Sequence, residues 1–120
     1  MAVILVIDDH EPIRKLLRAV LEGAGHNVQE APNGRLGLEL YQERPADLII
    51  MDMSMPEMSG LTLMLELARA CLDAKIIAIS GDMEGKRGLN AAKLLGARHT
   101  FQKPFDINAL LNAVKYDLAH

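Results

Sequence analysis

Five polar residues follow directly after short apolar runs: Asp8, Asp9, Asp52, Ser80 and Lys103. The runs cover residues 3–7, 48–51, 76–79 and, more briefly, 99–102. A carboxylate can bind a divalent cation or act as a nucleophile, a hydroxyl can donate to a phosphoryl oxygen, and an ammonium can pair with one. These residue types together indicate phosphoryl-transfer chemistry, provided that the fold brings them to one place.

Three crowded carboxylates need a compensating charge. Two like charges about 4 Å apart repel by roughly 4 kcal/mol at an effective dielectric near 20. Lys103 supplies one positive charge, and a hard divalent cation would supply two more. Mg²⁺ suits such a site because it takes one or two carboxylates and keeps open positions for waters and phosphate oxygens. We therefore expect Asp8 and Asp9 to bind Mg²⁺. Asp52, which stands alone before a flexible loop, is the expected nucleophile.

Alternating strands and helices are expected to position these residues. Short apolar runs between amphipathic stretches indicate buried parallel strands. We expect strands at 3–7, 27–31, 47–52, 75–80 and about 98–102, and helices at about 11–24, 34–43, after 60, 86–95 and after 106. Five strand–helix units predict a parallel sheet with helices on both faces. Ligands of such a sheet bind at the carboxyl ends of its strands, where the five polar residues stand.

Helical periodicity predicts which helix faces are buried. The first helix should bury Ile13, Leu16, Leu17, Val20 and Leu21, and the third should bury Leu61, Met64, Leu67, Ala68 and Cys71. Cys71 is interpreted as a small core residue. Arg14, Lys15 and Arg18 are interpreted as a solvated face of the first helix.

Composition limits the class of protein. A chain of 120 residues that is half apolar and 24% charged fits one globular domain. A net charge of −3 gives no general attraction to nucleic acid or membranes, and no apolar stretch approaches the roughly 20 residues of a membrane span. The single cysteine excludes an internal disulfide and fits a reducing compartment, so we expect a cytoplasmic protein.

Several motifs together resemble the receiver domain of bacterial two-component response regulators. The matching pieces are Ile7–His10, Met51–Gly60, Ser80–Gly81, Gly96–Ala97 and Lys103–Phe105, and the resemblance covers essentially the whole chain. It implies a flavodoxin-like (βα)5 doubly wound sheet of strand order 2-1-3-4-5. It also implies that residues 1–120 form a single receiver domain with no output domain in this chain.

The resemblance assigns capture of a phosphoryl group to one aspartate. Asp52 would accept it from a phosphohistidine of a sensor kinase or a histidine phosphotransfer protein. Mg²⁺ would be bound by Asp8, Asp9, Asp52 and the backbone carbonyl of Ser54. The domain would then act as a signalling switch rather than as an enzyme in the usual sense.

The resemblance also implies how capture is relayed. Ser80 would move toward the phosphoryl group, Lys103 would contact it, and the Lys103–Pro104 peptide would be cis. A partner, an output domain or a second copy would then bind the face made by the fourth helix, fifth strand and fifth helix.

One position departs from the family pattern. The family usually has an aromatic residue where this chain has Thr100, and the adjacent Phe101 should face the core by strand alternation. The expected switch residues are Ser80 and Thr100. We therefore expect activation to be transmitted to the binding face more through the loop Gly81–Gly85 than through Thr100.

Other functions remain open at the level of sequence. A phosphohydrolase of the haloacid-dehalogenase type usually carries a second aspartate two residues after the nucleophile, where this chain has Ser54. A degenerate receiver would bind partners without phosphate. Met51, Met53, Met55 and Met58 could bind soft copper but are better interpreted as packing residues. His10 is interpreted as the start of the first helix, and no phosphate-binding Gly-rich motif supports a nucleotide or flavin site.

Overall fold

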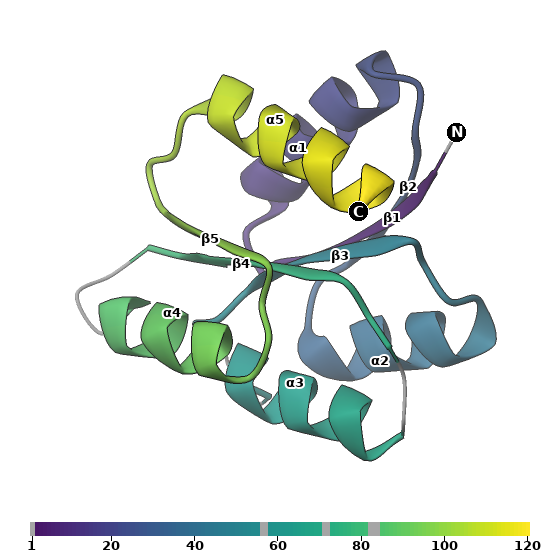
Figure 1. Ribbon diagram of the computed structural model, residues 1–120. Coiled ribbons are helices and arrows are strands. Elements are labelled where there is room, and N and C mark those ends of the chain that lie inside the picture. The colour runs from purple at the N-terminus through teal and green to yellow at the C-terminus, as the bar shows by residue number, and fades with distance from the viewer. Residues whose placement is uncertain (1, 56–57, 71–72, 82–84) are drawn as a thin grey trace.

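Strands and helices alternate along the chain in the computed structural model, which describes residues 2–55, 58–70, 73–81 and 85–120 (Figure 1). The elements are β1 (Val3–Ile7), α1 (Glu11–Gly23), β2 (Asn27–Ala31), α2 (Gly34–Glu43), β3 (Leu48–Asp52), α3 (Gly60–Arg69), β4 (Ile76–Ser80), α4 (Gly85–Leu94), β5 (His99–Gln102) and α5 (Ile107–Ala119). These bounds agree closely with the predicted ranges.

The five strands form one parallel sheet of order β2-β1-β3-β4-β5, which confirms the flavodoxin-like prediction. Figure 1 shows α1 and α5 on one face of the sheet and α2, α3 and α4 on the other. Ile7 pairs with Met51, and Asp52 pairs with Ile79, so β1, β3 and β4 end close together. The polar residues that follow these strands therefore lie at one edge of the sheet.

The sheet is buried on both faces, which explains why its central strands are apolar throughout. Along β1, Ile4 and Val6 pack in the core under α1 and α5, whereas Leu5 and Ile7 pack in the core on the opposite face. The methionines belong to this second core: Met51, Met53 and Met55 are buried in it, and Met58 packs against it. Their packing interpretation is confirmed.

The buried stripe of α1 is narrower than its periodicity predicts. Leu17 and Leu21 are fully buried, but Leu16 is 44% exposed. Because α1 lies against the sheet along one line of contact, Leu16 falls on the flank of that line. The prediction that Leu16 is buried is therefore wrong.

The predicted face of α3 is also shifted. Leu63, Met64 and Leu67 are buried, whereas Leu61 is 37% exposed and Ala68 is exposed. Because Leu63 is buried together with Met64 and Leu67, the centre of the buried face lies about 100° around the helix from Leu61. Cys71 lies outside the described residues.

The helix ends are capped as their sequences suggest. Asp106, the predicted cap of α5, accepts a hydrogen bond from the backbone N–H of Asn108, and Asn33 and Ser59 cap α2 and α3 in the same way. Within the described parts of the chain, every helix is too short or too polar to cross a bilayer.

Candidate functional site

The carboxyl edge of the sheet holds a buried cluster of opposite charges. Asp8 and Asp52 are each 2% exposed, at the ends of β1 and β3. The Lys103 ammonium, which follows β5, lies 3.0 Å from Asp8 Oδ2 and 3.2 Å from Asp52 Oδ2. The fold thus brings together three predicted site residues that are far apart in the sequence.

The two oxygens of Asp52 have different partners. Oδ1 accepts a hydrogen bond from the backbone N–H of Ser54 at 2.9 Å, and Oδ2 faces Lys103. Burial raises the pKa of Asp52, and the nearby charge of Asp8 raises it further, against the opposing effects of the Ser54 N–H and Lys103. The net direction is upward. The site groups three carboxylates, those of Asp8, Asp9 and Asp52, around the single ammonium of Lys103, which fits the binding of an additional cation.

Lys103 is held in its charged form. Burial alone would lower its pKa, but hydrogen bonds and charge interactions with Asp8 and Asp52 outweigh burial and raise the pKa above its ordinary value. Its peptide bond with Pro104 is cis, as the resemblance implies. At Gly81 a side-chain Cβ would lie 3.2 Å from Lys103 Cδ, so glycine leaves space for the lysine stem.

Two hydroxyls complete the cluster. Ser80, fully buried at the end of β4, lies with its Oγ 3.0 Å from the Oγ of Ser54. The backbone carbonyl of Ser80 also accepts a hydrogen bond from the N–H of Lys103. The structure therefore places Ser80 beside the loop that follows Asp52. The expected role of the Ser54 carbonyl as a metal ligand stays a prediction.

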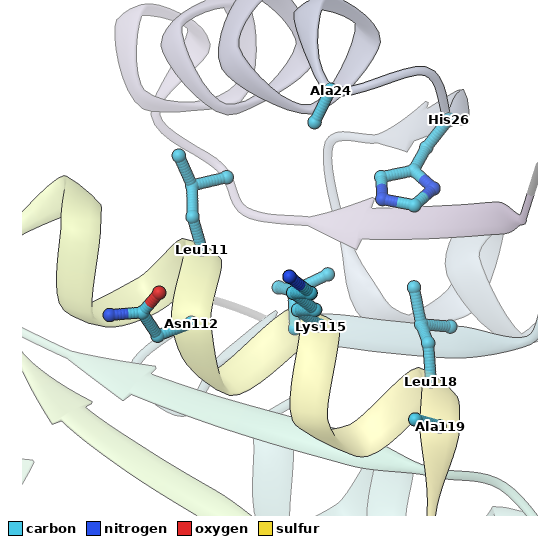
Figure 2. Close-up of a pocket in the computed structure, with 8 residues that line it drawn as sticks. Ala24, His26, Leu111, Asn112, Lys115, Leu118 and Ala119 are labelled. Atoms are coloured by element: carbon cyan, nitrogen blue, oxygen red, sulfur yellow. The ribbon is translucent and has the colours of Figure 1, made fainter.

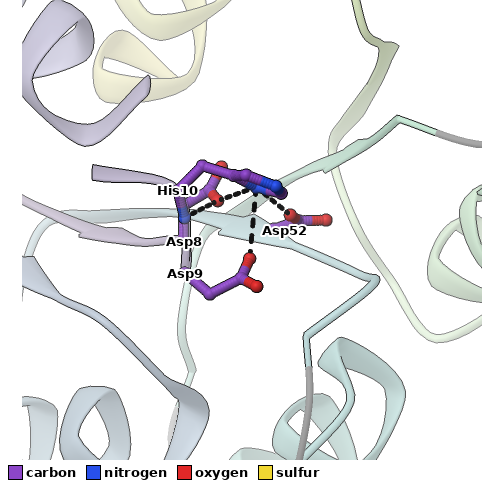
Figure 3. Close-up of side chains that lie close together, drawn as sticks. All are labelled: Asp8, Asp9, His10 and Asp52. Carbon is purple, nitrogen blue, oxygen red and sulfur yellow. Dashed lines mark hydrogen bonds and ion pairs between the residues drawn. The ribbon is translucent and has the colours of Figure 1, made fainter. Parts of the chain in front are cut away.

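Asp8, Asp9, His10 and Asp52 form a group that could hold a metal ion, with one potential ligand atom of each residue within 4.8 Å of the others (Figure 3). His10 is the N-cap residue of α1, as its interpretation as the helix start implies. Its imidazole nevertheless lies among the carboxylates, a position that the sequence pattern did not predict. The only available signal was its place directly after the two aspartates.

Arg14 contacts the backbone of this cluster at Asp8. Its guanidinium donates a 2.7 Å hydrogen bond to the backbone carbonyl of Asp8 and pairs with Glu30 of β2. The Arg14 side chain is only 14% exposed, so its interpretation as part of a solvated face is wrong. The reason is that α1 packs beside β2, which directs Arg14 toward the end of β1.

Addition of Mg²⁺ should raise the melting temperature of the protein, because an ion that binds only the folded state stabilises it by roughly 3 kcal/mol at a hundred times its dissociation constant. Asp9→Asn should lose most of this increase, since it removes one carboxylate without disturbing the Lys103 pairs. Differential scanning calorimetry with and without Mg²⁺ measures both. Glu43→Gln, an exposed change at the end of α2, is the matched control. An equal Mg²⁺ response in Asp9→Asn and the wild type would contradict the assignment of Asp9.

A cavity of about 380 Å³ opens at the cluster and is lined by His10, Asp52, Ser54, Gly81 and Lys103. A larger one, of about 590 Å³, lies between the end of α1 and α5, near Ala24 and Leu118 (Figure 2). That larger cavity is mostly apolar and lies toward the amino ends of the strands. The smaller cavity is the one of these two that opens at Asp52.

The predicted switch position is half-buried. Thr100 pairs with Ala78 in the sheet. Phe101 packs against the core under α1 and α5, with its ring 6.4 Å from that of Phe105, so the prediction that Phe101 faces the core is confirmed. Residues 82–84 of the loop expected to relay the signal lie outside the described residues.

Comparison with known proteins places these features in a family. Residues 4–115 match the family described as the response regulator receiver domain. The chain is 34% identical over 112 residues to the chemotaxis protein CheY of Thermotoga maritima, with 92% of each chain covered. It is 32% identical over 114 residues to sporulation initiation phosphotransferase F of Bacillus subtilis, covering 93% of this chain and 90% of that protein.

The fold is similar to that of solved structures as well. The crystal structure of a response regulator receiver domain protein from Clostridium thermocellum superposes with a TM-score of 0.91 at 28% identity. The match covers 99% of this chain and 95% of the other. Sequence and fold thus agree over nearly the same span.

Proposed function

The chain belongs to the response regulator receiver domain family, a family of phosphorelay signalling switches, and we propose that its Asp52 accepts a phosphoryl group from a phosphohistidine of a sensor kinase. The observation that carries the proposal is the buried Asp52 carboxylate, which shares the Lys103 ammonium with Asp8. A lone buried aspartate would not need this arrangement, whereas an aspartate that receives a phosphoryl group uses the lysine to bind the added charge.

The transfer uses groups already in place. An oxygen of the Asp52 carboxylate attacks phosphorus, the phosphorus–nitrogen bond of the donor breaks, and its electron pair stays on the donor imidazole. Lys103 and the Ser80 hydroxyl bind the transferred oxygens. Asp8 and Asp9 would hold Mg²⁺ together with Asp52, and when bound the ion would neutralise charge on the transferred group.

The direct test is incubation with acetyl phosphate and Mg²⁺ followed by intact mass measurement. The wild type should gain one phosphoryl group, and Asp52→Asn should gain none. EDTA should suppress the adduct in the wild type. Wild-type protein that stays unlabelled under conditions that label other receivers would instead support a degenerate, phosphate-independent receiver. The phosphohydrolase alternative is not favoured by the family match, and it predicts turnover of generic phosphate esters.

The groove beside Lys103 fits a protein donor of the phosphoryl group. A cavity of about 370 Å³ is lined by Ile13 and Leu16 of α1, by Phe105 and Ile107, and by Gly81, Lys103 and Pro104. Apolar side chains that are exposed or half-buried next to a buried charge cluster suit a partner that must place one histidine at Asp52. We place the docking of the kinase or phosphotransfer protein here.

Leu16→Asp should slow phosphotransfer from a phosphohistidine protein at least about tenfold, because it puts a charge in the apolar part of the docking surface. Labelling by acetyl phosphate should stay unchanged, since Leu16 is not among the residues that line the cavity at Asp52. Leu36→Asp, on Leu36 of α2, which is 36% exposed against 44% for Leu16, controls for a general effect of an added charge. If Leu16→Asp slows both donors to the same extent, the docking assignment is wrong.

The output side of the switch is proposed on the same basis. Phosphorylation would change the face of α4, β5 and α5, through Ser80 and the loop after β4 more than through Thr100, for a partner, an output domain or a second copy. We also propose that the switch works in the cytoplasm, that it does not turn over a separate substrate, and that it does not bind nucleic acid directly.

A further inference from the structure

His10 places a nitrogen donor among the carboxylates of the proposed magnesium site. Its Nδ1 lies 3.1 Å from Asp8 Oδ1, 3.2 Å from Asp9 Oδ1 and 3.9 Å from Asp52 Oδ2. Figure 3 shows the imidazole directed toward all three acids. The His10 side chain is 61% exposed and makes no helix-capping bond, and its Nδ1 lies within hydrogen-bond distance of Asp8 Oδ1.

Two of these three distances match those between adjacent ligands of one ion. Ligands at about 2.1 Å from an octahedral ion lie about 3.0 Å apart when adjacent and about 4.2 Å apart when opposite. The separations of Nδ1 from Asp8 and Asp9 correspond to adjacent positions, and the separation from Asp52 falls between the two values. The oxygens and the nitrogen can therefore converge on a single cation with small side-chain movements.

The donor set then decides which cation binds. Mg²⁺ prefers oxygen ligands, whereas imidazole nitrogen favours late first-row metals such as Co²⁺, Ni²⁺ and Zn²⁺. We propose that His10 is a metal ligand that gives the site a selectivity for late first-row divalent cations beyond its affinity for Mg²⁺. This inference rests on the proposed function, because it requires that Asp8, Asp9 and Asp52 bind a cation.

The test is isothermal titration calorimetry of the metal-free protein with Mg²⁺ and with Co²⁺ at one fixed pH. In His10→Ala the affinity for Co²⁺ should fall at least about tenfold more than the affinity for Mg²⁺. His10→Gln, which keeps a polar side chain but offers no imidazole, should show the same selective loss. The backbone hydrogen bond from residue 10 to Asp8 stays available in both variants. The wild-type Co²⁺ complex should also show a visible ligand-field spectrum that changes in both variants.

His120→Ala controls for cobalt bound by an exposed histidine outside the site. The proposal is overturned if both metals lose affinity by the same factor in His10→Ala and His10→Gln, or if His120→Ala removes as much Co²⁺ affinity. A failure of the proposed function would give a different experimental result from a failure of the His10 proposal. It would appear as wild-type protein that binds no Mg²⁺ and gains no phosphoryl group from acetyl phosphate.

Discussion

Lys103→Met is expected to destabilise the folded protein by about 3 kcal/mol at neutral pH, the lower end of the cost of breaking a buried ion pair. The lysine side chain is 15% exposed, and its ammonium is shared by Asp8 and Asp52, which are both nearly inaccessible to solvent. Without Lys103 these two carboxylates keep their mutual repulsion and their desolvation cost but lose the cation that offsets them.

The destabilisation should shrink in acid. When the carboxylates of Lys103→Met become protonated, the uncompensated charge disappears, so the difference in free energy of unfolding should be smaller at about pH 4 than at about pH 7. Urea unfolding at the two pH values measures it. Lys115→Met, at an exposed lysine of α5, should change stability little at either pH. A deficit of the same size at both pH values would indicate a packing defect rather than lost charge compensation.

Asp52→Asn is expected to have the opposite effect and to stabilise the metal-free protein at neutral pH. Burial and the charge of Asp8 raise the pKa of Asp52 above its ordinary value of 3.8. The folded state therefore binds the proton more tightly than the unfolded state. As pH rises from about 4 through the raised pKa, the free energy of unfolding of the wild type decreases and then levels off.

Asp52→Asn does not show this decrease, because asparagine does not ionise and Lys103 then pairs with Asp8 alone. The stability gained by Asp52→Asn should grow as pH rises through the raised pKa of Asp52. Denaturant titrations in EDTA over this range measure the gain, and Glu43→Gln is the control for an acid that is exposed. A loss of stability in Asp52→Asn would mean that the carboxylate is fully compensated, and the argument for an added cation would fail.

The fold was predictable because its signals are local. Each of the central strands β1, β3 and β4 is an apolar run that leads to a polar residue. An asparagine or aspartate marks the start of a helix at Asn33 and Asp106. The convergence of Asp52, Ser80 and Lys103 follows from the rule that parallel strands end at one edge. This rule alone predicts that the three side chains lie together, without knowledge of any tertiary contact.

Features that depend on how elements pack were not predictable. The periodicity of α1 does not say which side of its apolar stripe meets the sheet, so the exposure of Leu16 was missed. His10 and Arg14 turn toward Asp8 because α1 packs beside the end of β1. Asp117 is 1% exposed and lies 2.8 Å from Nδ1 of His99, a pairing across α5 and β5 that no spacing indicates.

The central claim is that the phosphoryl group is captured by the carboxylate of Asp52. An aspartyl phosphate is an acyl phosphate, so borohydride reduces it to homoserine at the residue that carried it. After labelling with acetyl phosphate and Mg²⁺, reduction and peptide mapping should place homoserine at position 52 alone. Homoserine at Asp8 or Asp9, or a phosphate ester on Ser80 that resists borohydride, would contradict the account.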